Sequence, residues 1–233
     1  MTRLYVVVEG QTEEAFVKGV LRPYLASRSI WAEPIIVSTS RATGGRKAKG
    51  GGNWKHWYDD LKRVLHQQRS SGAWVTTMFD LYGLPSDFPN IETVRSGSTV
   101  ADKIGAAERA IRDSVTGLDG AARLIPYVQQ HEYEALVLAS LEQLELVLDA
   151  DDDLRGVASL KSELAGHAPE DVNDGPNTAP SKRLQRHIPG YDKVLHGELA
   201  LIDTPLSDLA ERCPHFGAWV ARLMGLGDPE RQT

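Results

Sequence analysis

Two acidic side chains come directly after apolar runs, where carboxylates are able to bind metal ions or move protons. Glu9 follows residues 4–8, and Asp80 follows residues 74–79. Consecutive apolar and β-branched residues over such lengths predict strands that are buried on both faces of a parallel sheet. The carboxyl ends of such strands form the crevice in which open α/β sheets bind ligands, so we expect both carboxylates there.

Three further carboxylates are expected beside the same crevice. Glu13 lies in the first turn of the helix predicted after Glu9. Glu132 and Glu134 follow a third predicted strand, residues 123–128. Gathered carboxylates repel one another and are costly to bury unless a cation neutralises them. Their hard oxygen atoms select Mg²⁺, Mn²⁺ or Ca²⁺, and we expect Mg²⁺ or Mn²⁺ as the cofactor. The predicted metal ligands are Glu9, Glu13, Asp80 and Glu132, and the predicted catalytic groups are Glu9, Asp80 and Glu134.

Each of these acids also has an ordinary structural interpretation. Glu9 and Glu13 stand at the start of a predicted helix, where carboxylates are favoured in any case. Asp80 is equally suited to open a turn before Tyr82-Gly83. The acids at positions 132 and 134 share a face only if their backbone is extended. The metal site is therefore a hypothesis that requires these side chains to converge in space.

Basic residues in two places predict contacts with phosphate. The basic loop, residues 41–55, combines glycines and Trp54 with Arg46, Lys47 and Lys49. Glycines let a backbone approach a phosphate and aromatic rings stack on bases, so the loop favours nucleic-acid binding, with a solvated loop as the alternative. The spacing does not match a P-loop, because no Gly-Lys-Ser/Thr follows.

Two later lysines, Lys182 and Lys193, are further candidates for phosphate contacts. Ordinary salt bridges with the acidic run around Asp151 are the alternative for both of them.

The segment Val8-Glu9-Gly10-Gln11-Thr12-Glu13 resembles the opening motif of Toprim domains. Toprim domains occur in topoisomerases, primases and the overcoming-lysogenization-defect (OLD) nucleases. Their second hallmark is D-x-D after a hydrophobic strand, whereas this chain has Asp80-Leu81-Tyr82. The missing second aspartate argues against a full two-metal site.

More closely, the chain resembles a Toprim-like domain-of-unknown-function family, family 4276. The segments that carry this resemblance are His131–Leu136, Pro180–Leu184, Pro189–Lys193 and Cys213–Trp219. The resemblance implies a Toprim-like fold and metal dependence, and it supplies no reaction.

Alternating strand and helix patterns predict the architecture. Up to about residue 140 they favour βαβ units around a mostly parallel sheet, with residues 4–8 beside residues 74–79. We expect an α/β, Toprim-like (Rossmann-like) core over residues 1–148. Residues 149–233 should form a small helical extension packed on that core.

Composition limits the class of protein. The net charge of -6 over 233 residues excludes a general polyanion binder, so nucleic acid must meet a local basic patch or bound cations. A single cysteine, Cys213, excludes an internal disulfide and a multi-cysteine zinc site. No apolar run approaches the roughly 20 residues of a membrane span, and the first is too short for a signal peptide. A cytoplasmic protein is expected.

Three functions remain open. The first is a Mg²⁺-dependent nuclease or phosphodiesterase, expected to act on DNA or RNA. OLD-type relatives often work with an ATPase and this chain has no Walker motif, so an ATPase would be a separate subunit. A homodimer is a further expected assembly. The alternatives are a non-catalytic regulatory subunit with a decayed metal site and a small-molecule phosphatase or phosphotransferase.

Overall fold

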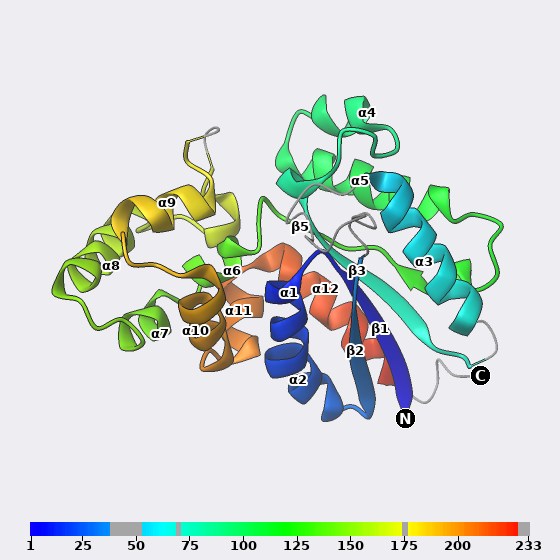
Figure 1. The fold of residues 1–233 in the computed structure, drawn as a ribbon, viewed down its shortest axis with the longest axis horizontal. Coiled ribbons are helices and arrows are strands. Elements are labelled where there is room, and N and C mark those ends of the chain that lie inside the picture. The colour runs from blue at the N-terminus through cyan, green and yellow to red at the C-terminus, as the bar shows by residue number, and fades with distance from the viewer. Residues whose placement is uncertain (38–52, 69–70, 174–176, 228–233) are drawn as a thin grey trace, which may run out of the picture.

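A parallel β-sheet forms the centre of the protein. The structure is a computed structural model that describes residues 1–37, 53–68, 71–173 and 177–227. The strand order is β2-β1-β3-β4, and β5 also pairs with β3 (Figure 1). The strands are β1 (Thr2–Val8), β2 (Ile30–Ile36), β3 (Trp74–Asp80), β4 (Leu124–Ile125) and β5 (Val128–Gln129). Every pairing is parallel, which confirms the predicted α/β class.

The two predicted central strands are direct neighbours. β1 pairs with β3 in a register that sets Val8 opposite Met78. Glu9 and Asp80 follow within one and two residues of that pair, at the same edge of the sheet. The expectation that residues 4–8 and 74–79 lie side by side is confirmed.

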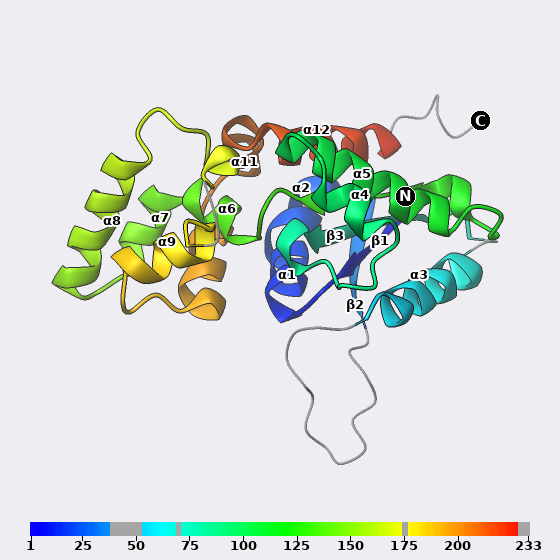
Figure 2. The same cartoon turned by 90° about the horizontal axis from the view of Figure 1, so that it is seen from above.

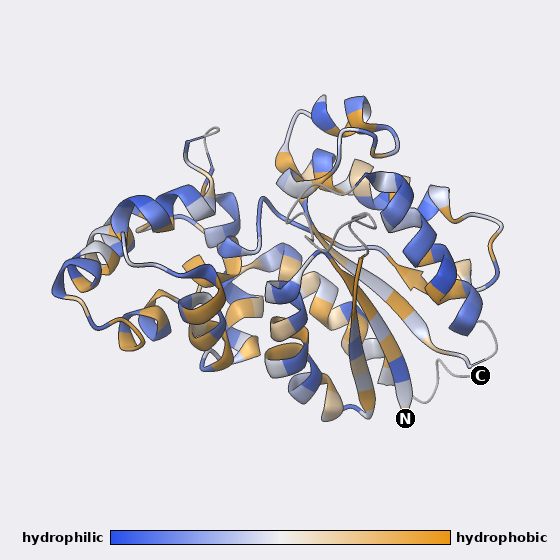
Figure 3. Ribbon diagram, in the orientation of Figure 1, coloured by the Kyte–Doolittle hydropathy of each residue, from blue (hydrophilic) through white to orange (hydrophobic). Residues whose placement is uncertain are grey.

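Side chains of β1 alternate between two hydrophobic cores, as a strand buried on both faces requires. Leu4, Val6 and Val8 belong to one core, and Val7 belongs to the other. The first core also takes in α1 (Gln11–Phe16), η1 (Val17–Leu21) and α2 (Arg22–Ala26). The second core lies under α3 (Trp54–Gln68) and α5 (Val100–Ser114), and the outward side of α3 is largely hydrophilic (Figure 3).

Most of the remaining helices gather beside the sheet. Figure 2 shows α7, α8 and α9 grouped at one side of the strands. The other α-helices of the described residues are α4 (Ile91–Arg95), α6 (Glu134–Leu138), α7 (Leu141–Leu146), α8 (Asp151–Glu163), α9 (Pro180–His187), α10 (Glu198–Ile202), α11 (Leu206–Arg212) and α12 (Pro214–Met224). The other short 3₁₀- and π-helical segments are η2 (Leu81–Gly83), η3 (Ala121–Arg123), η4 (Pro169–Asp171), η5 (Lys193–Gly197) and η6 (Gly225–Gly227). Within the described residues, none of the helices combines the length and apolar character needed to cross a bilayer.

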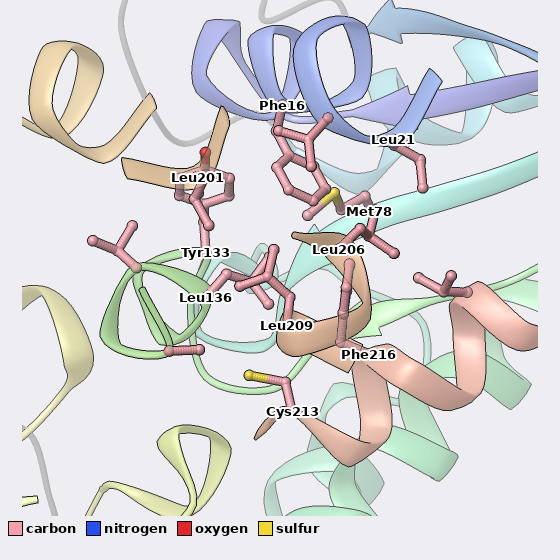
Figure 4. Packing of buried hydrophobic residues seen from close by; sticks show 14 of the residues in the cluster. Phe16, Leu21, Met78, Tyr133, Leu136, Leu201, Leu206, Leu209, Cys213 and Phe216 are labelled. Atoms are coloured by element: carbon pink, nitrogen blue, oxygen red, sulfur yellow. The ribbon is translucent and has the colours of Figure 1, made fainter. Parts of the chain in front are cut away.

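The last helices return to the sheet and share its first core. Trp219 of α12 donates a hydrogen bond from Nε1 to Thr76 Oγ1 at 2.9 Å, and its ring stacks on Tyr127 at 4.2 Å between centroids. Figure 4 shows Met78 of β3 packed with Phe216 of α12 in the same cluster. Cys213 is buried among these side chains as a small hydrophobe. The division of the chain at residue 148 stays a prediction.

The strand predicted over residues 123–128 forms as two short strands, β4 and β5. Pro126 lies between them and has no N–H to donate to a β-ladder. At the next residue, Thr77 Oγ1 donates to the Tyr127 carbonyl at 2.8 Å and accepts the Tyr127 N–H at 2.9 Å. The side chain of β3 thus replaces the missing ladder bonds and holds the chain that leads to residues 132–134.

Candidate active site

Glu9 and Asp80 are joined at the carboxyl ends of neighbouring strands. The backbone N–H of Asp80 donates to Glu9 Oε1 at 2.7 Å, so the Glu9 side chain reaches across to the end of β3. Gly83 lies against the same carboxylate, since a Cβ atom there would stand 2.8 Å from Glu9 Oε2. A side chain at position 83 would therefore have to displace the end of the Glu9 side chain.

A lysine and a glutamate face this pair from the helical side. Lys193 Nζ lies 3.2 Å from Glu134 Oε1 and 5.4 Å from the centroid of the Tyr133 ring. Glu134 is buried, and Lys193 is partly exposed. Burial by itself lowers the pKa of Lys193. The charges of Glu134, Asp80 and Glu13 together outweigh burial, so the pKa of Lys193 is raised. The predicted phosphate-binding residue Lys193 is thus paired with a carboxylate of the site and not with the acidic run around Asp151.

Asp80, Glu134 and Lys193 border a pocket of about 250 Å³. Its lining residues are Asp80, Tyr82, Gly83, Glu132, Glu134, Ser181 and Lys193. Glu132 stands at one wall, where Oε2 accepts the Ser181 N–H of α9 at 3.0 Å. The volume is smaller than the roughly 300–1,000 Å³ of sites for drug-sized ligands, and it suits a phosphate group with its immediate neighbours. Another surface depression, lined by Met1, Trp31 and Glu33 among others, lies at the opposite ends of β1 and β2, away from these acids.

The carboxylates of the site hold their protons unusually tightly. Burial, reinforced by the charge of Glu13, raises the pKa of Glu9 to about 8 against the opposing Asp80 hydrogen bond and Lys193. Burial and the charges of Glu9 and Glu13 raise the pKa of Asp80 well above its usual range. Burial also raises the pKa of Glu134, with Lys193 opposing it. The site thus gathers more carboxyl groups than Lys193 could neutralise if all of them were ionised.

The donor set fits a hard divalent cation in chemistry and charge. Its oxygen atoms come from carboxylates whose raised pKa values reflect burial and mutual repulsion, which a cation would relieve. In the part of the chain that the structure describes, no group of three or more His, Cys, Asp or Glu is arranged to hold a metal ion. Mg²⁺ commonly uses one or two protein carboxylates and completes its shell with water and substrate phosphate. The metal site and its ligand set stay a prediction.

Tyr82 follows Asp80 by two residues, at the position where the sequence resemblance to Toprim domains would call for a second aspartate. Its hydroxyl lies 2.9 Å from His131 Nδ1 and accepts a hydrogen bond from the Asn173 side-chain amide. Sequence reasoning noted the departure from the motif and missed the contribution of Tyr82 to the pocket. It also missed Ser181, which only the packing of α9 brings there.

The other residues that were predicted to bind phosphate are not seen at the pocket in the described part of the chain. Lys182 is exposed on α9, one residue beyond Ser181. Arg46, Lys47 and Lys49 of the basic loop lie outside the described residues. Nucleic-acid binding by these residues stays a prediction.

Comparison with known proteins places the chain in a family. Comparison with curated proteins and with solved structures found no match. The family described as Domain of unknown function (DUF4276) matches residues 8–224, which include all the described acids of the site. Since the match spans nearly the whole chain, the protein belongs to this domain-of-unknown-function family.

Proposed function

We propose that the protein is a Mg²⁺- or Mn²⁺-dependent phosphodiesterase that cleaves nucleic acid. The observation that carries this proposal is the junction of Glu9 and Asp80 at adjacent parallel strand ends, with Lys193 across the pocket. The carboxylates attract a cation, and the lysine attracts an anion. A phosphodiester bound between a cation and Lys193 would have its negative charge stabilised by both of these positive charges.

Each side chain has a role that its surroundings support. Asp80 and Glu13 would hold the cation, which would activate water and neutralise phosphate charge when bound. Glu9, whose carboxylate accepts the Asp80 N–H, would accept and return a proton as general base and acid. Asp80 fixes the Glu9 carboxylate through its backbone N–H, and Glu134 orients the Lys193 ammonium toward the pocket.

A non-catalytic subunit is the second candidate, and the Lys193–Glu134 ion pair favours it. An ammonium at 3.2 Å from a buried carboxylate supplies positive charge that a metal ion would otherwise bring. Tyr82 also removes one ligand of the two-metal Toprim pattern. If the protein is such a subunit, Lys193 takes the place of the metal ion in neutralising the carboxylates, and the chain acts by binding a partner.

A degradation assay with metal titration separates the candidates. The native protein is incubated with DNA and with RNA in Mg²⁺, in Mn²⁺ and in EDTA, beside the isosteric variant Asp80→Asn. We expect metal-dependent cleavage that Asp80→Asn abolishes while nucleic-acid binding and the unfolding midpoint are largely kept. Absence of Mg²⁺ and Mn²⁺ binding by calorimetry would favour the second candidate. Hydrolysis of phosphomonoesters without nucleic-acid cleavage would favour the phosphatase alternative.

A further inference from the structure

The aromatic ring of Tyr82 stands at the rim of the pocket beside Asp80. The side chain lines the pocket, and the residue is 49% exposed. Large aromatic side chains are usually buried more completely than this when they serve only the core. An exposed ring directly beside the proposed phosphate position is therefore a candidate ligand contact.

Three hydrogen bonds fix the orientation of this ring. The Tyr82 backbone N–H donates to the His131 carbonyl at 3.1 Å. The phenol oxygen accepts from the Asn173 amide, so the phenol proton is free to donate to His131 Nδ1 at 2.9 Å. The rings of Tyr82 and His131 also contact each other, with centroids 5.2 Å apart. The hydroxyl group of Tyr82 is thus already hydrogen-bonded, and its aromatic ring is the part that a ligand in the pocket can contact.

His131 adopts an unfavourable conformation in order to hold Tyr82. Its φ of 62° is in the left-handed region, which costs energy for a non-glycine residue. The ring is buried. Strained backbone conformations cluster at active sites and ligand sites. The arrangement therefore indicates that the position of Tyr82 matters for binding.

We infer that Tyr82 is a stacking platform for an unpaired nucleobase next to the phosphate bound between Asp80 and Lys193. This inference rests on the proposed function and specifies its substrate: a single-stranded nucleic acid or an unpaired end. Every base has a π-face, so stacking on Tyr82 tolerates sequence. A base inside a duplex is stacked on its neighbours and has no free face to offer. Tyr82 should therefore make the protein bind single-stranded nucleic acid in preference to a duplex.

Binding measurements with base-free nucleotides test the stacking directly. Fluorescence anisotropy compares labelled single-stranded DNA and RNA oligonucleotides with copies in which one nucleotide at a time lacks its base. Ca²⁺ replaces Mg²⁺ because it has the same charge and the same preference for oxygen ligands. We expect one position at which loss of the base weakens binding to the native protein by about 5- to 150-fold, the size of one base–aromatic stack.

Two variants assign that loss to the ring. Tyr82→Leu removes the ring, so the intact and the base-free oligonucleotides should bind it about equally. Tyr82→Phe keeps the ring and loses the bonds to His131 and Asn173, so most of the difference between the two oligonucleotides should remain. A duplex should bind the native protein more weakly than its single strands.

Each outcome decides the inference. A native protein that loses no affinity at any base-free position overturns stacking, even if Tyr82→Leu fails to fold. A Tyr82→Leu variant that keeps the full base dependence also overturns it, while cleavage by the native protein leaves the proposed function standing. If the native protein neither binds nor cleaves oligonucleotides, the proposed function and this inference fail together.

Discussion

Replacing Glu9 with glutamine should stabilise the cation-free protein at alkaline pH. Glutamine keeps a carbonyl oxygen to accept the Asp80 N–H, which is 2.7 Å from Glu9 Oε1. It also keeps nearly the same shape beside Gly83, where the space is tight. The variant removes only the negative charge, which burial and the neighbouring Glu13 make unfavourable.

The magnitude follows from the pKa of Glu9. A rise from 4.5 to about 8 corresponds to about 5 kcal/mol at about 1.4 kcal/mol per pH unit. The effective dielectric response of a protein reduces this energy, so we expect the unfolding free energies of the native protein and Glu9→Gln to differ by about 2–4 kcal/mol at alkaline pH. Because the folded-state pKa is raised, this contribution to stability is complete below pH 4.5 and is lost as the pH rises to about 8. Glutamine does not titrate, so the variant should not show this decline.

Guanidinium unfolding in EDTA measures the effect. Native protein and Glu9→Gln should have similar unfolding free energies near about pH 5, and the variant should be more stable near about pH 9. Added Mg²⁺ should recover part of the native deficit, about 2.7 kcal/mol at a hundredfold excess over the dissociation constant. The Glu9→Asp variant is the matched control, because it keeps the charge and loses the reach to Asp80. Parallel pH dependence of the native protein and Glu9→Gln in EDTA would refute this account of the site.

The other predictions concern Lys193, His215 and the number of cations. Lys193→Met should weaken oligonucleotide binding and reduce its salt slope by about one unit, because one phosphate contact is lost. Burial lowers the pKa of His215, but its hydrogen bond to Glu108 together with the charges of Glu108 and Glu170 raises it above 6.5. The stability that this pair adds is present below pH 6.5 and lost as the pH rises through the raised value, so His215→Gln should flatten this part of the stability–pH curve in denaturant titrations. Calorimetry should find one Mg²⁺ per chain.

The sheet was predictable because its long strands are local patterns. β1 and β3 are continuous apolar runs, and the strand-end rule places Glu9 and Asp80 at one edge. The split of residues 123–128 also has a visible signal in Pro126, since a proline inside an apolar run interrupts a central strand. Strand ends are thus the part of the site that sequence reasoning reaches most directly.

The opposite wall of the pocket depends on contacts between distant parts of the chain. Ser181 reaches Glu132 only because α9 packs against α6, and the resemblance over Pro180–Leu184 gave no sign of this contact. Tyr82 is anchored by Asn173, a residue 91 positions away. The left-handed backbone of His131 has no local signature either, because neither glycine nor asparagine stands there. Tertiary packing, which periodicity does not encode, determines this half of the site.

The number of divalent cations that the site can bind depends on Tyr82 and Lys193, which face its carboxylates. In two-metal sites both the attacking and the leaving oxygen atoms contact a metal ion. Here Tyr82 offers no carboxylate, and its hydroxyl is engaged with His131 and Asn173. Lys193 instead brings a fixed positive charge to the far wall. Because Lys193 already supplies positive charge across the pocket from Asp80 and the Tyr82 position lacks a carboxylate, we expect the free protein to bind one divalent cation.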